Sequence, residues 1–254
     1  MFSLAGRRGL VVGIANEHSI AWGCARACHT AGAEIAATYL NAKAERFVRP
    51  LAESIDCPII LPCDLEQPGQ LEAVFGAIAE HWGRLDFLIH SVAYAPLEQL
   101  HGRVVDCDSA AFLRAMDVSC HSLIRMAKQA EALMPEGGTI LTMSYYGAEK
   151  VVEHYGMMGP VKAALEATVR YLAYELAARH IRVHALSPGP MPTRAASGLA
   201  HFDELLAQAV AKSPLHTLAT PDDVGALSAF LVSDAARNLT GSVFHIDAGY
   251  NIVD

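Results

Sequence analysis

Short runs rich in aliphatic and β-branched residues alternate with longer stretches of helical periodicity along nearly the whole chain. The runs with strand character cover residues 9–14, 34–39, 58–62, 85–90, 137–142, 181–187 and 242–246. The helical stretches cover residues 20–31, 43–54, 69–82, 109–133, 160–179, 201–212 and 221–233. Such alternation is typical of parallel strands joined by right-handed crossover helices. The sequence therefore predicts an α/β fold: a doubly wound, seven-stranded parallel sheet with helices on both faces, and ligands at the carboxyl ends of the strands.

Composition limits the number of domains and the kinds of partner. The 254 residues fit one domain, residues 1–254, because no repeat or low-complexity linker divides them. Apolar residues make up 52% of the chain, enough to cover both faces of a parallel sheet. Nucleic acid and anionic membranes are bound by clustered lysines and arginines, whereas this chain has a net charge of -8. We therefore expect neither as a partner.

The cysteines and histidines show no binding pattern. The six cysteines form no CxxC pair, and the twelve histidines lack metal-ligand spacing. The apolar run Gly9–Ile14 near the start is far shorter than a signal peptide or a membrane span. We therefore expect a cytoplasmic protein with free thiols and no metal.

The turn after the first strand has the small residues that a dinucleotide pyrophosphate requires, although it is not a GxGxxG motif. Gly13 ends the strand, and Ser19 and Gly23 follow at the start of the next helix. Such a turn lets backbone amides approach a phosphate. The alternative is an ordinary glycine at a strand end.

Two later strand ends strengthen this prediction. Asp64 and Leu65 follow the third strand, where the aspartate can either accept a hydrogen bond from an adenine amino group or cap a helix. Ser91, Val92 and Ala93 follow the fourth strand and are small enough for a flat ring to lie on the backbone, or simply to pack. Three compatible strand ends in this order predict a dinucleotide site.

The end of the second strand indicates which nicotinamide cofactor binds. An acidic residue there favours NAD and an arginine favours NADP, but the segment Thr38–Asn41 contains neither. Lys43 and Arg46 lie one turn further on, within reach of a 2′-phosphate. The sequence favours NADH and leaves NADPH possible.

Two tyrosine–lysine pairs follow the fifth strand. Tyr146 and Lys150 have the YxxxK spacing of ordinary short-chain dehydrogenases, whereas six residues separate Tyr155 from Lys162. A lysine that holds the nicotinamide ribose belongs at the start of a long helix, where its ammonium also lowers the tyrosine pKa. Lys162 opens such a helical run and Lys150 does not. We therefore favour Tyr155 and Lys162 as the catalytic pair.

The longer spacing has a chemical meaning. In carbonyl reduction the hydride and the proton go to adjacent atoms. In conjugate reduction of an enoyl thioester, hydride enters at Cβ while negative charge develops further away, on the thioester oxygen. The acidic phenol then has to stand further from the lysine, which is the direction in which the additional residues displace Tyr155 from Lys162.

These features resemble one family from about Leu4 to Ile252, nearly the whole chain. The segments GIANEHSIAWG, CDL, HSVAYAP and SPGPMPTRAASG, together with the longer Tyr–Lys spacing, are similar to the bacterial enoyl-[acyl-carrier-protein] reductases of the short-chain dehydrogenase/reductase superfamily. The resemblance implies a Rossmann-type homotetramer in fatty-acid biosynthesis. It implies that NADH or NADPH reduces a trans-2-enoyl thioester, carried on acyl carrier protein or coenzyme A, to the saturated acyl thioester.

The resemblance also implies roles for individual residues. Tyr155 matches the tyrosine that hydrogen-bonds the thioester carbonyl, and Lys162 matches the lysine that holds the ribose. Tyr145 matches a second active-site tyrosine, with a buried structural aromatic as the alternative. The implied cofactor contacts are Gly13, Ser19, Ile20, Asp64, Leu65, Ser91, Val92, Ala93, Lys162, Pro190 and Thr193. The implied substrate contacts are Ala93, Tyr94, Tyr145, Tyr155, Met158, Ala195, Ala196 and Phe202.

A substrate-covering segment is expected near residues 191–212. Residues 195–202 match the family segment that closes over the acyl chain, and their small side chains suit a loop that orders on binding. The alternative is a plain surface loop. Met158 and Phe202 are either pocket wall or simple core.

Two other functions stay open at this stage. One is a ketone or alcohol oxidoreductase that uses Tyr146 and Lys150. The other is a catalytically idle nucleotide-binding regulatory protein, against which the complete Tyr155–Lys162 pair speaks.

Overall fold

One parallel sheet organises the computed structural model, which describes residues 3–100, 102–192 and 202–253. In this part of the chain the sheet has seven strands in the order β3-β2-β1-β4-β5-β6-β7. The strands are β1 (Arg8–Val12), β2 (Glu34–Tyr39), β3 (Ile59–Pro62), β4 (Phe87–His90), β5 (Gly138–Met143), β6 (Ile181–Pro188) and β7 (Val243–Ile246). The strand order reverses between β1 and β4, so the predicted doubly wound sheet is confirmed.

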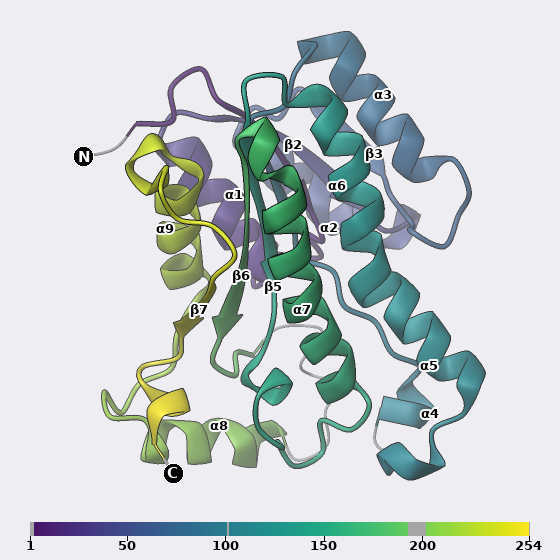
Figure 1. The fold of residues 1–254 in the computed structure, drawn as a ribbon, viewed down its shortest axis with the longest axis vertical. Helices are drawn as coiled ribbons and strands as arrows, with labels where there is room; N and C mark the ends of the chain where they lie inside the picture. The colour runs from purple at the N-terminus through teal and green to yellow at the C-terminus, as the bar shows by residue number, and fades with distance from the viewer. Residues whose placement is uncertain (1–2, 101, 193–201, 254) are drawn as a thin grey trace.

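Helices cover both faces of this sheet (Figure 1). They are α1 (Ile20–Thr30), α2 (Ala42–Glu53), α3 (Gln70–Trp82), α4 (Leu97–Leu100), α5 (Ser109–Met116), α6 (Ser122–Leu133), α7 (Met158–Leu176), α8 (Phe202–Lys212) and α9 (Pro221–Val232). One-turn segments are η1 (Val104–Asp106), η2 (Asp117–His121), η3 (Tyr146–Ala148), η4 (Ala177–Arg179), η6 (Asp234–Ala236) and η7 (Tyr250–Ile252). Helices α1, α2 and α9 pack on one face and α3, α6 and α7 on the other.

Alternate strand residues belong to two separate cores. In β4, Phe87 and Ile89 pack toward α1 and α9, whereas Leu88 packs toward α3 and α6. All three side chains are fully buried. A strand that is buried on both faces therefore appears in the sequence as a continuous apolar run.

The helix predicted over residues 109–133 is interrupted in the structure. The π-helical turn η2 separates α5 from α6. Within it, the Ser119 hydroxyl accepts a hydrogen bond from the Tyr94 amide at 2.8 Å and donates to the Tyr94 carbonyl at 3.0 Å. The extra residue in this turn places Ser119 against the loop after β4, an effect that apolar periodicity does not reveal.

Helix α1 crosses α9 at two glycines. A Cβ at Gly23 would lie 2.2 Å from the Pro221 carbonyl oxygen, and one at Gly225 would lie 2.4 Å from the Gly23 carbonyl oxygen. Both distances are shorter than any real contact of this kind, so neither position accepts a side chain while the backbones stay in place. The crossing fixes α1, whose first turn follows β1.

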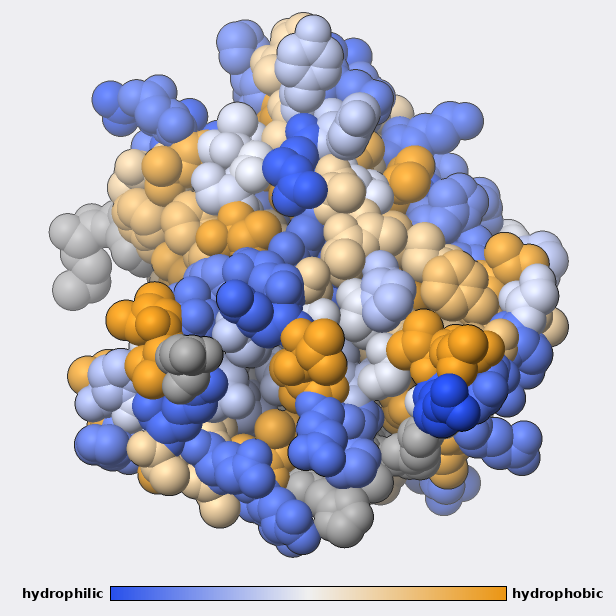
Figure 2. Space-filling view, turned by 60° about the horizontal axis from the view of Figure 1, so that its bottom comes forward, coloured by the Kyte–Doolittle hydropathy of each residue, from blue (hydrophilic) through white to orange (hydrophobic). Residues whose placement is uncertain are grey.

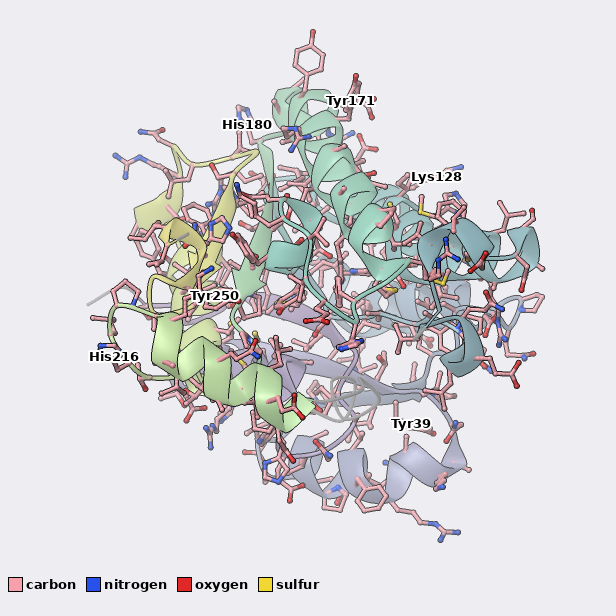
Figure 3. All side chains as sticks on the ribbon, turned by 90° about the horizontal axis from the view of Figure 1, so that it is seen from below. Tyr39, Lys128, Tyr171, His180, His216 and Tyr250 are labelled. Atoms are coloured by element: carbon pink, nitrogen blue, oxygen red, sulfur yellow. The ribbon has the colours of Figure 1, made fainter. Side chains whose placement is uncertain are left out.

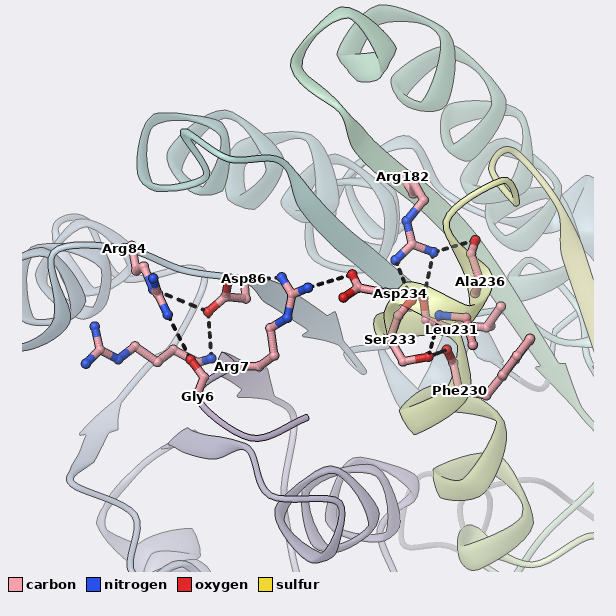
Figure 4. Close-up of polar contacts among 12 residues, drawn as sticks. Gly6, Arg7, Arg84, Asp86, Arg182, Phe230, Leu231, Ser233, Asp234 and Ala236 are labelled. Atoms are coloured by element: carbon pink, nitrogen blue, oxygen red, sulfur yellow. Dashed lines mark hydrogen bonds and ion pairs between the residues drawn. The ribbon is translucent and has the colours of Figure 1, made fainter. Parts of the chain in front are cut away.

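The amino-terminal end of the sheet is held by arginines (Figure 4). The Arg7 guanidinium lies 3.3 Å from Asp86 and 2.6 Å from Asp234, which joins the loop before β4 to the end of α9. Arg182 donates to three carbonyls at and just after the end of α9, those of Leu231, Ser233 and Ala236. Arg182 therefore satisfies carbonyl groups at a helix end, where the helix dipole favours positive charge.

Candidate active site

A pocket of about 390 Å³ lies at the carboxyl ends of the strands, within the size range of small-molecule sites. Figure 2 brings this end of the molecule forward and shows apolar residues there in separate patches. Among the described residues, Lys162 is the one charged residue in the pocket wall. The wall consists of Ile20, Ser91, Val92, Ala93, Tyr94, Ala95, Leu97, Leu100, Met143, Ser144, Tyr145, Tyr155, Met158, Lys162, Pro188, Gly189, Pro190, Met191 and Leu205.

The turn after β1 packs tightly against the loop after β4. Gly13 has a positive φ of 111°, and a Cβ there would lie 2.0 Å from the Ser91 carbonyl oxygen. The Ser19 hydroxyl accepts hydrogen bonds at 3.0 Å from the amides of Ala15 and Asn16. Glycine is therefore required at position 13, and the turn is held in shape from the start of α1.

The loops after β3 and β4 are tied to each other. The Arg114 guanidinium lies 4.6 Å from the centre of the Tyr94 ring and forms two hydrogen bonds with the Glu66 carboxylate, of 2.6 and 2.8 Å. Arg125 donates to the Leu65 carbonyl at 3.1 Å. These contacts place Tyr94 in the pocket wall and link it to the loop that contains Asp64.

His90, at the end of β4, is a fully buried neutral histidine. Its Nε2 lies 2.8 Å from the Ser122 hydroxyl, which already donates to the Val118 carbonyl, so Nε2 is the protonated nitrogen. Its Nδ1 accepts from Thr142 at 2.8 Å. Burial, and then the nearby Lys162, lower the pKa of His90 to about 3. This histidine joins β4, β5 and α6 beneath the pocket floor.

Lys162 lies in the second turn of α7 and is 5% exposed. Its Nζ donates to the Met143 carbonyl at the end of β5, at 2.6 Å. Burial lowers the pKa of Lys162 to about 8. Pro160, expected at the first helical position, is the third residue because α7 begins at Met158. It still lies in the first turn, where no backbone partner is lost.

Tyr155 and Tyr145 meet edge to face, with ring centres 4.8 Å apart. Burial raises the pKa of both phenols well above the usual value, so both are hydrogen-bond donors at neutral pH. The sequence predicts that Lys162 lowers the pKa of Tyr155, whereas in this structure burial outweighs any such effect. The Tyr145 hydroxyl is buried and has no hydrogen-bond partner among the described residues.

Gly147 makes room for the Tyr155 ring. A Cβ at this position would lie 2.5 Å from the ring atom Cδ1 of Tyr155. The short turn η3, which contains Gly147, therefore fixes the ring from one side while Tyr145 fixes it from another.

The structure brings together many, but not all, of the predicted site residues. Gly13, Ser19, Asp64 and Leu65 are not in the pocket wall and lie in the turns beside it. Asp64 accepts a hydrogen bond from the Glu66 amide at 3.0 Å, which is a turn contact. Thr193, Ala195 and Ala196 lie outside the described residues, as does the side chain of Phe202.

Several wall residues have no signal in the sequence pattern. Met143 ends the buried strand β5 and Ser144 follows it. Leu97 and Leu100 belong to the four-residue helix α4, which is too short to show periodicity. Leu205 reaches the pocket from α8. Only the folded arrangement of β5, α4 and α8 identifies them.

The alternative tyrosine–lysine pair lies apart from the pocket. Tyr146 is 9% exposed and packs edge to face on Tyr250, with ring centres 5.6 Å apart. Lys150 is exposed, and neither residue lies in the pocket wall. The geometry therefore favours Tyr155 and Lys162.

Comparisons with known proteins identify the family of this chain. Residues 13–251 match the family model described as enoyl-(acyl carrier protein) reductase. The chain belongs to this family. A reductase from Rhizobium meliloti, named enoyl-[acyl-carrier-protein] reductase [NADH] 2, is 44% identical over 97% of this chain and 92% of its own length.

Solved structures of family members have the same fold as this chain. The reductase of Anaplasma phagocytophilum, solved with NAD, is 46% identical, covers 100% of this chain and 97% of its own, and gives a TM-score of 0.95. The Bacillus cereus enoyl-acyl carrier protein reductase, solved with NADP+ and an indole naphthyridinone, is 41% identical. The match covers 100% of both chains and has a TM-score of 0.97. The resemblance seen in the sequence is confirmed at the level of the family, and the roles of single residues remain predictions.

Membrane spans and metal sites are two features that the described residues lack. No helix among them is both long and apolar enough to cross a membrane. Within the same residues, no group of three or more His, Cys, Asp or Glu side chains is arranged to hold a metal ion.

Proposed function

We propose that this chain reduces the trans-2 double bond of an enoyl thioester to the saturated acyl thioester in fatty-acid biosynthesis. NADH is the hydride donor, and acyl carrier protein carries the acyl group. The observation that carries the proposal is the presence of Tyr155 and Lys162 in one largely apolar pocket of an enoyl reductase fold.

The residues present fit a dinucleotide. Gly13 lets the turn after β1 pack against Ser91, and Ile20 and Ser91 line the pocket. An ammonium has three N–H groups, and the Met143 carbonyl uses one of those of Lys162, which leaves donors for the hydroxyls of a ribose. When bound, NADH supplies the hydride that goes to Cβ of the substrate.

Tyr155 acts on the thioester oxygen. As the double bond is reduced, negative charge grows on that oxygen, and the protonated Tyr155 hydroxyl donates a hydrogen bond to it. This interaction is stronger in the transition state than in the ground state, so it lowers the barrier. Tyr145 supports the Tyr155 ring, and its unpartnered hydroxyl is available to an acceptor in the pocket.

The pocket wall suits an uncharged acyl chain. Its apolar part comes from the β4 loop, α4, the start of α7 and α8: Ala93, Ala95, Leu97, Leu100, Met158 and Leu205. Burial of an acyl chain against these residues is favourable at about 25 cal/mol per Å² of apolar surface. It also excludes water from the thioester.

The choice of NADH rests on the relatives and on the end of β2. The Rhizobium meliloti reductase is named for NADH, and the Anaplasma phagocytophilum structure contains NAD. In this chain the Asn41 side chain caps α2, accepting from the amides of Lys43 and Ala44 at 3.1 Å. Lys43 and Arg46 are exposed beside it, so binding of NADPH is a measurable second possibility.

An absorbance assay tests the proposed function. Purified protein is mixed with a crotonyl or longer enoyl thioester, and loss of the reduced nicotinamide band is followed with NADH and with NADPH. We expect turnover with NADH at a higher kcat/KM than with NADPH. Turnover of simple ketones with no reduction of the conjugated double bond would show that the proposal is wrong.

We also propose that the chain works as a homotetramer. Apolar side chains stand exposed on neighbouring helices of one face: Leu113 on α5, Ile124 on α6, and Tyr171 and Tyr174 on α7. Helices α6 and α7 lie side by side in Figure 1, and Tyr171 lies at the edge of the molecule in Figure 3. Exposed apolar side chains on neighbouring helices of one face are typical of a contact between copies.

The cytoplasm is the proposed location. All six cysteines are free, among them Cys24 and Cys28, which lie one turn apart on α1. Free thiols suit a reducing compartment. A fluorescent fusion found outside the cytoplasm would contradict this part of the proposal.

A further inference from the structure

Two consecutive residues at the end of β5 are held by two side chains one turn apart on α7. The Lys162 ammonium donates to the Met143 carbonyl, and the Glu166 carboxylate accepts from the Ser144 hydroxyl. Lys162 is 5% exposed and Glu166 is 6% exposed. The next residue after this doubly held segment is Tyr145, which packs on Tyr155.

Glu166 has no part in the reaction described above, although it lies beside the residues that do. A buried carboxyl group costs free energy unless it has partners. The Ser144 hydroxyl donates its one O–H in a hydrogen bond to the Glu166 carboxylate, so this bond favours the ionised form of Glu166. The negative charge of Glu166 raises the pKa of Lys162, which lies one helical turn away on α7.

Other charged groups also face Glu166. Burial raises the pKa of Glu166 most, and the negative charge of Glu149, at the end of η3, raises it further. The Ser144 hydrogen bond, His245 on β7 and Arg170 on α7 lower it. The Glu149 carboxylate and His245 Nε2 lie 3.2 Å apart. The Glu166 charge raises the pKa of two buried groups, Tyr155 and Lys162, and of these Lys162 is the one whose charged form it stabilises.

We propose that Glu166 is a positioning residue that supplies the counter-charge of Lys162, so that Lys162 remains an ammonium while it holds the nicotinamide ribose. This rests on the proposed function, because the ribose contact of Lys162 belongs to it. A buried cation without a counter-charge gives up its proton, and a neutral amine is a weaker donor to ribose hydroxyls.

The direction of the pH effect follows from the groups around Lys162. Burial lowers its pKa to about 8, and Cys120 and Glu166 act in the opposite direction. Removing the Glu166 charge therefore lowers the pKa of Lys162 further. The amine of the variant then loses its proton at a lower pH than that of the wild type. As the pH rises, NADH binding therefore begins to weaken at a lower pH in the variant.

The test is the pH dependence of NADH binding to Glu166→Gln without substrate. Glutamine has nearly the same shape and still accepts from Ser144, so the substitution removes the charge alone. Kd is measured by fluorescence titration from pH 6.5 to 9.5. We expect the midpoint of the alkaline weakening to fall by about half a pH unit, which makes the ratio of variant to wild-type Kd roughly threefold larger at pH 8.5 than at pH 6.5.

Two further variants separate charge from structure. Glu175→Gln lies on the exposed side of α7 and should leave the midpoint unchanged. Glu166→Asp keeps the charge and changes the shape, so its midpoint should agree with the wild type even if its affinity is lower. The Glu166→Asp result stands as a test by itself if Glu166→Gln does not fold, since a shifted midpoint there would contradict the proposal.

The outcomes distinguish this inference from the proposed function. A Glu166→Gln protein whose Kd rises by the same factor at every pH would show that Glu166 is only structural. Wild-type protein that binds no NADH at any pH would instead show that the proposed function is wrong. Wild-type binding that weakens near pH 8, with a parallel Glu166→Gln curve, would overturn the inference alone.

Discussion

At the scale of single residues, substitutions of the two candidate tyrosines are expected to have different effects on activity. Tyr155→Phe removes the donor to the thioester oxygen, and loss of one such donor typically costs about 10²–10³-fold in kcat. Tyr146→Phe changes a residue outside the pocket wall, so we expect kcat within about twofold of the wild type. Enoyl thioester reduction is measured for both variants, with thermal unfolding as the control for folding. A larger loss of activity in Tyr146→Phe would reverse the choice of catalytic pair.

The sequence was sufficient to choose this pair but not to find its surroundings. Tyr155 and Lys162 are separated by a fixed spacing near the start of a periodic helix, which is information along the chain. Ser144 and Glu166 meet because the end of β5 packs on α7, and nothing in either segment alone indicates that contact. The burial that raises the pKa of Tyr155 is likewise a property of the folded pocket.

At the scale of elements, the strands were predictable because buried parallel strands leave continuous apolar runs. The run predicted at residues 137–142 became β5, Gly138–Met143. The break between α5 and α6 was not predictable, because the apolar repeat continues through η2 and the π turn depends on Ser119 reaching Tyr94. Helix α4 was missed because one helical turn shows no repeat.

The α1–α9 crossing provides a prediction about an element. Gly225→Ala puts a Cβ 2.4 Å from the Gly23 carbonyl oxygen, so α1 has to move away from α9. We expect a loss of about 1–3 kcal/mol in the free energy of unfolding, and a higher Kd for NADH because α1 begins at the Gly13–Ser19 turn. Denaturant unfolding and NADH titration measure the two effects.

The matched control for this substitution is Gly76→Ala on α3. Position 76 is exposed, and a Cβ there meets nothing within 4 Å. Alanine in an exposed helix interior should stabilise by roughly 0.5–1 kcal/mol and leave the Kd unchanged. Equal effects of the two substitutions would mean that the crossing does not position α1.

At the scale of the whole molecule, the two ends of the sheet have different tasks. Charged groups such as Arg7, Asp86 and Asp234 join elements at the amino-terminal end. The carboxyl end holds the pocket, whose wall includes a single charged residue among those described. Charged pairs near the pocket, such as Arg114 and Glu66, lie outside its wall, which leaves the wall largely apolar.

The exposed apolar residues on α5, α6 and α7 lead to a prediction about the oligomeric state. Tyr174 is 85% exposed in the single chain, and Tyr174→Glu would place a charge in a contact between copies. We expect multi-angle light scattering to give a tetramer for the wild type and a smaller assembly for Tyr174→Glu, because loss of one set of symmetric contacts divides a tetramer. Val151→Glu, at a fully exposed loop position outside these helices, should remain tetrameric. A wild-type monomer, or an unchanged mass for Tyr174→Glu, would show that this face does not join the subunits.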